Sequence, residues 1–432
     1  MKKYFKRLQK SLSILILTVC FSLEGATVIH AGTLLDGTGS EAVTEMSIVI
    51  DNQMITRVET GYIEPESDDT YLDLTGYFIL PGLIDMHVHL SSEYSSKSYE
   101  ESISLNSSDY AIKAVANARK TLLAGFTSVR NLGDSGNVTV SLRNAINKGV
   151  VPGPRIFSSG KTISSSGGHG DPSNSLRSNL SSDPGPAQGV INNSSDSFKA
   201  VRYRYKENAD LIKITATGGV LSNAKNGQNP QMTSEEISSI VLAARDYGFK
   251  VAAHAHGAEG IKRAVIAGVD SIEHGTLMDS EGMKLMREKG TYYVPTLLAG
   301  SWVADKAKID GFFPDLVRPK ALEIGPQLKI TFAKAYQAGV KIAFGTDTGV
   351  SSHGKNAEEF YEMVDAGMPE IQAILSATKE ASILLGQNSM LGSITVGKYA
   401  DIIAVSGNPL DNIRILETVD FVMKSGEIYK SP

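Results

Sequence analysis

The chain has 432 residues, in which 42 Lys and Arg nearly balance 47 Asp and Glu, and it contains one cysteine. This length is too great for one small core, but it suits a barrel with an appended domain. The near balance of charge leaves no broad basic face, so nucleic acid is not expected as a partner. The single cysteine, Cys20, excludes a disulfide framework within one chain.

Residues 1–26 have the layout of a secretory signal peptide. Residues 1–10 are basic, and the apolar segment 11–23 is too short to span a bilayer comfortably. We expect cleavage after Ala26 and an exported protein, periplasmic or secreted, that is not stably inserted in a membrane. A retained membrane anchor and a lipid attachment at Cys20 are the alternatives.

The two ends of the chain share one sequence pattern. In residues 27–80, short segments of alternating apolar and polar residues are separated by turn signals such as Asp36 followed by Gly37. The same pattern occurs again in residues 387–432. We therefore expect both ends to fold together as one small β-sandwich beside a central domain.

The central residues, 81–386, alternate apolar runs typical of strands with amphipathic stretches typical of helices. Eight such runs predict an α/β fold, a (β/α)₈ TIM-like barrel whose chemistry lies at the C-terminal ends of the strands. The segment 164–195 is rich in Ser, Gly, Asn and Pro, and we expect a long loop over the barrel mouth. After the first run, which ends at His87, the other seven runs are 126–130, 155–158, 210–214, 250–254, 270–274, 292–296 and 341–345.

Two histidines at the end of the first run indicate half of a metal site. His87 and His89 follow the apolar residues 78–84. Successive side chains of a strand point to opposite faces, so residues two apart share a face and can bind one ion. Taken alone the pair is only suggestive, because neighbouring histidines are often surface or structural residues.

Three further residues with coordinating side chains follow apolar runs at the ends of predicted strands. They are His254, His274 and Asp347, after the fifth, sixth and eighth runs. In a parallel barrel these strand ends meet at one face. Imidazole and carboxylate suit zinc, although manganese, cobalt or iron would also be accepted. The set predicts a metal site at the barrel mouth.

Lys213 is the unexpected residue of the fourth strand, because both faces of that strand should be buried. An unpaired ammonium there would cost roughly several kcal/mol. One interpretation is a buried salt bridge. The other is that carbon dioxide adds to the neutral amine and gives a carbamate, which is anionic and can bridge two cations.

The chain resembles the binuclear amidohydrolase superfamily in the order and strand position of six residues: His87, His89, Lys213, His254, His274 and Asp347. The resemblance extends from Thr27 to the C-terminus. It is closest to the branch of metal-dependent dipeptidases and carboxypeptidases, which includes zinc-dependent arginine carboxypeptidase and Xaa-Pro dipeptidase-like enzymes. The phrases similar to that branch are residues 127–133, 166–170, 216–220, 253–257, 271–275 and 353–360.

The resemblance implies two divalent ions, with Zn²⁺ preferred, and a metal-bridging hydroxide that attacks the amide carbonyl, because bound water loses its proton near neutral pH. Asp347 would take the proton of that hydroxide and pass it to the leaving amine. The implied ligands divide into His87, His89 and Asp347 for one ion, His254 and His274 for the other, and carboxylated Lys213 between them.

Three residues are candidates for contacts with the substrate. His256 lies two residues after His254, so it should point into the same cavity, and it or His169 would donate a hydrogen bond to the carbonyl or the developing oxyanion. His256 could instead support a metal ligand from behind, and His169 could be an exposed loop residue. Arg130 could clamp a substrate carboxylate or form a structural ion pair within the barrel.

The main hypothesis is an exported metallopeptidase, a dipeptidase or carboxypeptidase that releases a C-terminal amino acid from dipeptides or short peptides. The alternative is hydrolysis of another amide, such as an N-acyl amino acid or a cyclic amide as in imidazolonepropionase-like enzymes. A non-catalytic scaffold is a third hypothesis, which a measurement of bound metal would test. The resemblance also implies a possible homo-oligomer. The preferred side chain depends on loops that no spacing rule interprets.

Overall fold

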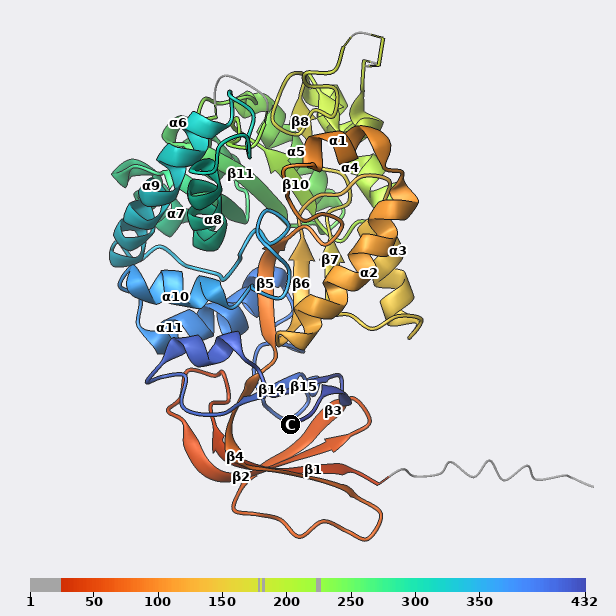
Figure 1. Ribbon diagram of the computed structural model, residues 1–432, viewed down its shortest axis with the longest axis vertical. Coiled ribbons are helices and arrows are strands. Elements are labelled where there is room, and N and C mark those ends of the chain that lie inside the picture. The colour runs from red at the N-terminus through yellow and green to blue at the C-terminus, as the bar shows by residue number, and fades with distance from the viewer. Residues whose placement is uncertain (1–24, 178, 181–182, 223–226) are drawn as a thin grey trace, which may run out of the picture.

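The computed structural model describes residues 25–177, 179–180, 183–222 and 227–432. The predicted leader, including Cys20, lies almost wholly outside these residues. Figure 1 shows a larger part built of helices and strands above a smaller part built of strands. Within the described residues, no helix has both the length and the apolar character needed to cross a membrane.

The smaller part is a seven-stranded sheet with the strand order β16-β15-β14-β4-β1-β2-β3. Strand β4 joins the two chain ends, because it pairs in parallel with β1 and antiparallel with β14, where Ile402 lies opposite Pro81. Figure 1 shows the N-terminal strands in orange beside the C-terminal strands in blue. The strands are β1 (Thr27–Leu34), β2 (Val43–Asp51), β3 (Met54–Thr60), β4 (Thr70–Pro81), β14 (Ile402–Val405), β15 (Phe421–Lys424) and β16 (Glu427–Lys430).

This part differs from the two-sheet sandwich that the sequence predicts. The seven strands are hydrogen-bonded into one sheet, since β4 pairs with neighbours on both of its edges. Apolar side chains from both chain ends, among them Ile29, Ile48, Ile402 and Phe421, form one buried cluster against this sheet. The two chain ends therefore share one core, as expected, whereas a sandwich of two sheets is not confirmed.

The larger part is TIM-barrel-like, as predicted, and its strands run in parallel in sheets of the order β5-β6-β7 and β10-β11-β12-β13. Backbone hydrogen bonds from Ile163 to Lys213 (2.9 Å) and from Asp210 to Ser158 (2.7 Å) link the two sheets. The strands are β5 (Leu83–Val88), β6 (Phe126–Asn131), β7 (Arg155–Ser158), β10 (Ile212–Thr215), β11 (Val251–Gly257), β12 (Ser271–Leu277) and β13 (Tyr292–Val294).

The eighth predicted strand, 341–345, is less regular than expected. Its residues pair with β13 through an isolated bridge between Tyr293 and Ile342. On the other side, the backbone N–H of Met86 in β5 donates to the carbonyl of Phe344 at 2.9 Å. A left-handed backbone at Asp347, with φ of 55°, turns the chain soon afterwards. The segment still lies between β13 and β5, where the barrel prediction requires it.

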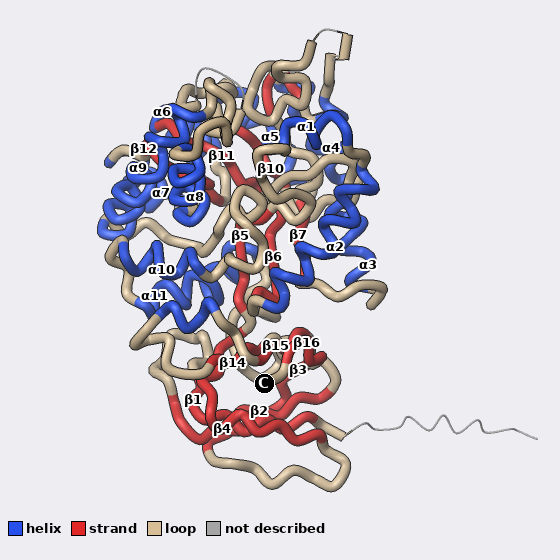
Figure 2. Tube along the Cα trace, in the orientation of Figure 1, coloured by secondary structure: helices blue, strands red, loops and turns tan. Residues whose placement is uncertain are grey.

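Helices surround these strands, as the blue and red tubes of Figure 2 show. Their formation follows local rules: Thr233 and Glu236 cap the start of α5 through reciprocal hydrogen bonds of 3.2 and 2.8 Å. The helices are α1 (Ser98–Ser104), α2 (Ser107–Leu123), α3 (Val138–Asn147), α4 (Ser194–Lys206), α5 (Ser234–Asp246), α6 (Ala258–Ala267), α7 (Ser280–Lys289), α8 (Leu297–Ala307), α9 (Arg318–Gln337), α10 (Glu358–Asp365), α11 (Glu370–Leu375) and α12 (Ala381–Leu385).

The predicted loop 164–195 contains short elements of its own in its described residues. They are β8 (Ser164–Ser165), η1 (Pro186–Gln188) and β9 (Val190–Ile191), and β8 pairs with β9 in parallel. Of two further short helical elements, η2 (Ser376–Glu380) lies between α11 and α12, and η3 (Ile413–Glu417) lies between β14 and β15. The described residues of this segment therefore include paired strands, and just before it the backbone N–H of Ile163 donates to the carbonyl of Lys213 in β10.

Candidate metal centre and active site

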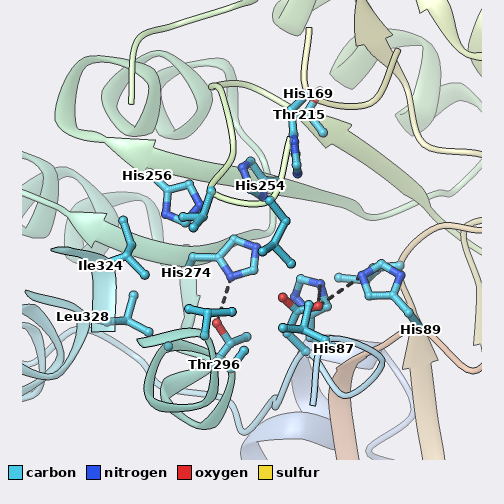
Figure 3. A pocket seen from close by; sticks show the side chains of 18 of the residues that line it. His87, His89, His169, Thr215, His254, His256, His274, Thr296, Ile324 and Leu328 are labelled. Atoms are coloured by element: carbon cyan, nitrogen blue, oxygen red, sulfur yellow. Dashed lines mark hydrogen bonds and ion pairs between the residues drawn. The ribbon is translucent and has the colours of Figure 1, made fainter. Parts of the chain in front are cut away.

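The strand ends of the barrel open into one cavity of about 250 Å³. Figure 3 shows histidines from several strands pointing into it. All six predicted ligands and both predicted hydrogen-bond donors line this cavity: His87, His89, Lys213, His254, His274, Asp347, His169 and His256. Side chains from strands far apart in the sequence therefore meet at one place.

The first three ligands form a compact group. His87 lies in β5 and His89 directly after it, and Nε2 of these two rings lies 3.4 and 3.2 Å from Oδ1 of Asp347. One ligand atom from each of the three residues lies within 4.8 Å of the others. A backbone hydrogen bond of 2.7 Å from the N–H of Asp347 to the carbonyl of His87 fixes this approach.

The charge state of this group suits a cation. Burial opposes ionisation of Asp347, but His87 and His89 hold its pKa below the usual range. Burial, with Lys213 acting in the same sense, lowers the pKa of His87 to about 4. At neutral pH the pair therefore consists of a carboxylate and a neutral imidazole, which are the forms that bind a divalent ion.

Lys213 lies in β10, is buried and lines the cavity. Its Nζ is 3.4 Å from Nε2 of His87. Burial lowers the pKa of the Lys213 ammonium to about 8, although Glu273 and Asp347 oppose this shift. A lowered pKa increases the fraction of neutral amine, and that is the form able to add carbon dioxide.

His254 and His274 lie on the neighbouring strands β11 and β12, with ring centroids 4.7 Å apart. Nε2 of His254 is 3.0 Å from the carbonyl of Gly218, and Nδ1 of His274 is 2.8 Å from the hydroxyl of Thr296. Each ring therefore has one nitrogen held by the protein and the other available to the cavity. Burial lowers the pKa of both rings well below the ordinary value, which keeps them neutral.

The backbone of this site is held in an unusual conformation at three residues. His274, Thr296 and Asp347 have φ values of 70°, 55° and 55°. A left-handed conformation costs a residue other than glycine roughly 1 to 2 kcal/mol, and the cost is greatest for β-branched side chains such as Thr. All three residues line the cavity, so this cost occurs where the backbone directs the His274 imidazole, the Thr296 hydroxyl that contacts it and the Asp347 carboxylate into the site.

Two of the three candidate substrate contacts, His256 and His169, also face the cavity. His256 follows His254 on β11, and its Nδ1 is 2.8 Å from the hydroxyl of Thr276. His169 comes from the loop after β8, and its ring lies 4.4 Å from that of His254. Burial lowers the pKa of His256 to about 3 and that of His169 to about 4, so both are neutral N–H donors at pH 7.

Two buried polar atoms at this site make no hydrogen bond in the described part of the chain. They are Oδ1 of Asp347 and Nδ1 of His169. Buried polar atoms are otherwise satisfied in nearly all cases, so such an atom in a cavity indicates a ligand that the protein chain does not supply. Neutral imidazoles, a carboxylate and a lysine that can become a carbamate fit two divalent ions at this place.

The structure places Arg130 in the structural ion pair, which was one of the two alternatives that the sequence left open. The residue is 2% exposed and does not line the cavity. Its guanidinium donates to the carbonyl of Met86 at 2.6 Å, to Ser271 at 3.0 Å and to Glu273 at 2.8 Å. Because these three acceptors hold it inside the barrel, it corresponds to the structural ion pair that was the alternative.

Glu273 is a residue of the site that the sequence analysis missed. Its Oε2 lies 2.9 Å from Nδ1 of His87, and its other oxygen accepts from Arg130. Burial opposes ionisation of Glu273, but Arg130 and His87 lower its pKa to about 2. The carboxylate therefore orients the His87 ring and leaves Nε2 for the cavity. A charged residue within a buried strand was the available signal, the same one that identified Lys213.

Asp85 was also missed, and it supports the same strand end. It is buried, and its carboxylate accepts from the backbone of His87 at 3.0 Å and from the hydroxyl of Thr346 at 2.7 Å. Asn356 donates to it at 2.8 Å. His353, the first residue of the phrase 353–360, does not line the cavity, and its Nε2 lies 2.9 Å from the carbonyl oxygen of Ser92.

Known proteins resemble this chain over most of its length. The model of the amidohydrolase family matches residues 78–430. An ochratoxinase of Aspergillus niger is 31% identical over 435 residues, which cover 94% of this chain and 87% of that protein.

Two solved structures extend this similarity to the fold. The crystal structure of a Xaa-Pro dipeptidase with methionine bound in its active site has 54% identity and a TM-score of 0.92, with 94% of this chain and 100% of that chain covered. A prolidase complexed with N-methylphosphonate-L-proline has 31% identity and a TM-score of 0.86, with the same shares covered.

Proposed function

The chain belongs to the amidohydrolase family, and we propose that it is a metal-dependent hydrolase that cleaves the amide bond of dipeptides or short peptides and releases the C-terminal amino acid. The observation that carries this proposal is the approach of His87, His89 and Asp347 within 4.8 Å beside the buried Lys213. The similarity to a Xaa-Pro dipeptidase with a free amino acid in its active site supports release of an amino acid.

Two divalent ions, most suitably Zn²⁺, would supply an activated water and polarise the substrate carbonyl. The chain's own residues would hold these ions: His87, His89 and Asp347 one, His254 and His274 the other, and a carbamate on Lys213 both. Nδ1 of His87 contacts Glu273, and Nδ1 of His274 contacts Thr296. These contacts fix the tautomer of each ring and leave Nε2 of each ring to bind an ion.

Asp347 is the proposed proton carrier. Its Oδ1 is buried without a hydrogen bond from the described chain, so it can accept the proton of the attacking water. The same oxygen then donates this proton to the nitrogen of the leaving amine, which departs as a neutral amino group. Because the neighbouring imidazoles keep the pKa of Asp347 low, it holds the proton only briefly.

His256 and His169 would stabilise the negative charge that develops on the carbonyl oxygen. Both rings are neutral, face the cavity and can donate an N–H. The hydroxyl of Thr276 at Nδ1 of His256 leaves Nε2 of this ring toward the cavity. Removal of one such donor typically costs about 10²- to 10³-fold in kcat.

The test is a panel of Xaa-Arg, Xaa-Lys, Xaa-Pro and aromatic dipeptides with N-acyl amino acids, using metal-loaded protein and its Lys213→Ala variant. We expect turnover of dipeptides with a free carboxylate and its loss in the variant. A matched control is Lys334→Ala, which changes an exposed lysine on α9. Silence toward every dipeptide would refute the peptidase proposal.

A second candidate is hydrolysis of N-acyl amino acids or cyclic amides. We keep this candidate because an ochratoxinase is 31% identical to this chain, and its match covers the same share of the chain as the match to the dipeptidase, 94%. Turnover of acylated or cyclic amides without dipeptide turnover would support it.

A further inference from the structure

Helix α8 begins in an unusual way. The residue before its first turn is Thr296, whose backbone is left-handed, with φ of 55° and ψ of 45°. A Thr at this position of a helix usually has an extended backbone, and its hydroxyl accepts from an N–H of the first turn. The Thr296 side chain makes no such hydrogen bond, and its hydroxyl instead lies 2.8 Å from Nδ1 of His274. Figure 3 shows this contact as a dashed line. The residue that would normally cap the helix therefore holds the ring of a candidate metal ligand.

Glu359 caps α8 in place of Thr296. Its two side-chain oxygens accept from the backbone N–H groups of Leu297 at 2.9 Å and Leu298 at 2.6 Å. These are two of the N–H groups that the start of a helix leaves without a partner inside the helix. An acidic group is also favoured there by the helix dipole. Because Glu359 follows Leu297 by 62 positions, this cap is supplied by tertiary packing.

Glu359 is an unfavourable residue to bury. It is 0% exposed, and within the described part of the chain it forms no ion pair. Burial raises the pKa of its carboxyl well above the ordinary value, and the two N–H groups of α8 oppose this shift. A buried acidic group without a cation costs free energy that an apolar side chain would not. An acid at this place therefore indicates a specific role for its contact with α8.

The start of α10 holds Glu359 in place. Asn356 donates to the buried carboxylate of Asp85 at 2.8 Å, and the backbone N–H of Glu359 donates to the carbonyl of Asn356 at 3.2 Å. Asp85 in turn accepts from the backbone of His87. Figure 1 shows α10 below α8, and the two helices pack together. One helix start therefore reaches the backbone of His87 through Asp85 and the first turn of α8 through Glu359.

Helix α8 also forms part of the cavity. Together with α9 it provides an apolar wall, whose residues are Ala299, Gly300 and Val303 from α8 and Ile324 and Leu328 from α9. Since Glu359 holds the first two residues of α8, it fixes the end of this helix that lies next to Thr296.

We propose that Glu359 is a positioning residue for the metal centre: by capping α8, it frees the hydroxyl of Thr296 to hold the His274 ring. Without Glu359, the free N–H groups of the first turn of α8 would attract this hydroxyl, and Nδ1 of His274 would lose its partner. The proposal rests on the metal centre of the function proposed above. It goes beyond that function because Glu359 itself does not line the cavity.

The test is a titration of metal-free protein with Zn²⁺, using wild type, Glu359→Leu, Thr296→Val and the double variant. Leucine removes both acceptor oxygens and keeps an apolar side chain of similar size. We expect Thr296→Val to lower the affinity for one of the two ions about 10- to 100-fold, and Glu359→Leu to lower it about tenfold. Glu358→Leu is the matched control, because Glu358 lies on the same helix with its side chain 37% exposed, and its affinity should equal that of wild type.

The double variant shows whether Glu359 acts through Thr296. If it does, adding Glu359→Leu to Thr296→Val should lower the affinity by less than about threefold more, because residues in one network do not act additively. The same tenfold loss in both backgrounds, or wild-type affinity in Glu359→Leu, overturns the inference. If Glu359→Leu does not fold, Glu359→Gln replaces it. This variant keeps one acceptor oxygen, and its smaller loss should likewise disappear in the Thr296→Val background.

Ring signals of histidine separate this inference from the proposed function. If wild type binds no Zn²⁺, the proposed metal centre fails, and nuclear magnetic resonance of metal-free protein with ¹⁵N-labelled histidine becomes the deciding measurement. The Nδ1 signal of His274, assigned with His274→Gln, should shift in the same direction in Glu359→Leu and in Thr296→Val. An unchanged signal in Glu359→Leu overturns the positioning role, whatever the metal titration shows.

Discussion

Two buried charge clusters at opposite ends of the barrel contrast with each other. The mouth cluster consists of His87, Arg130 and Glu273, and the residues are at most 3% exposed in their side chains. The junction cluster consists of Arg155, Asp401 and Lys424. It connects β7 with the small sheet through an ion pair of 2.7 Å, in which the Arg155 side chain is 20% exposed.

The comparison teaches that the same kind of ion pair serves two purposes. At the mouth, Glu273 accepts from Arg130 and contacts a ring nitrogen of His87, so the pair fixes the orientation of a candidate metal ligand. At the junction, Asp401 accepts from Arg155 and from the backbone of Ser425, so it joins two parts of the fold. The first cluster should therefore control activity and the second only stability.

The largest effect is expected from Glu273→Ala. It leaves a buried guanidinium and a ring nitrogen of His87 without their partner, and breaking a buried pair in this way costs about 3 to 5 kcal/mol. Metal affinity should fall about 10- to 100-fold with the loss of the orienting carboxylate. Denaturant unfolding and metal content after dialysis measure the two effects, and wild-type values for both would contradict the role of the mouth cluster.

Lys424 provides a pH-dependent test of the junction. Burial, with a contribution from Arg155, lowers its pKa from 10.5 to about 8, and it donates to the carbonyl of Gly153 at 2.6 Å. Between pH 8 and 10.5 the unfolded chain holds a proton that the folded chain has released, so this group makes the folded protein more stable as pH rises. The gain is at most about 3 kcal/mol over that range.

The measurement is the free energy of unfolding of wild type and Lys424→Met at pH 7 and pH 10. The difference between the two proteins should change with pH in favour of the wild type at pH 10. A difference that is constant across this range would show that Lys424 keeps its ordinary pKa in the folded protein.

Asp401→Asn should have a smaller effect. The substitution keeps the shape of the side chain but replaces a charged acceptor of Arg155 by a neutral one, and a hydrogen bond of this type contributes about 1 to 3 kcal/mol. Stability should fall within that range while kcat is unchanged, because the junction lies at the end of the barrel away from the cavity. A fall in kcat at saturating metal would show that the two ends are coupled.

The smallest effect is expected from Ile112→Ser on α2. This side chain is 73% exposed, so its removal should change stability by less than about 0.5 kcal/mol and leave kcat unaltered. A loss of more than about 1 kcal/mol would show that the residue is covered by another protein chain in solution.

The sequence by itself determined which residues gather at the candidate metal site and the order of the barrel strands. His87 and His89 share a strand face because side chains alternate along a strand, and His254, His274 and Asp347 follow apolar runs that end at one side of a parallel barrel. Lys213 was identified because an ammonium inside a buried strand requires a partner. The arguments for His87, His89 and Lys213 use only the pattern within one strand, and the argument for the other three residues adds only the common direction of the strands in a parallel barrel.

The tertiary structure decided what lies opposite each of these residues. Arg130 and Glu273 are 143 positions apart, and only barrel closure brings them together. The sequence therefore left open whether Arg130 contacts the carboxylate of a substrate or a carboxylate of the protein. In the same way, the apolar wall of Ile324 and Leu328 depends on how α9 packs beside the cavity. Spacing along the chain determines which residues share a face of a strand or helix. Long-range packing determines which other residues that face contacts.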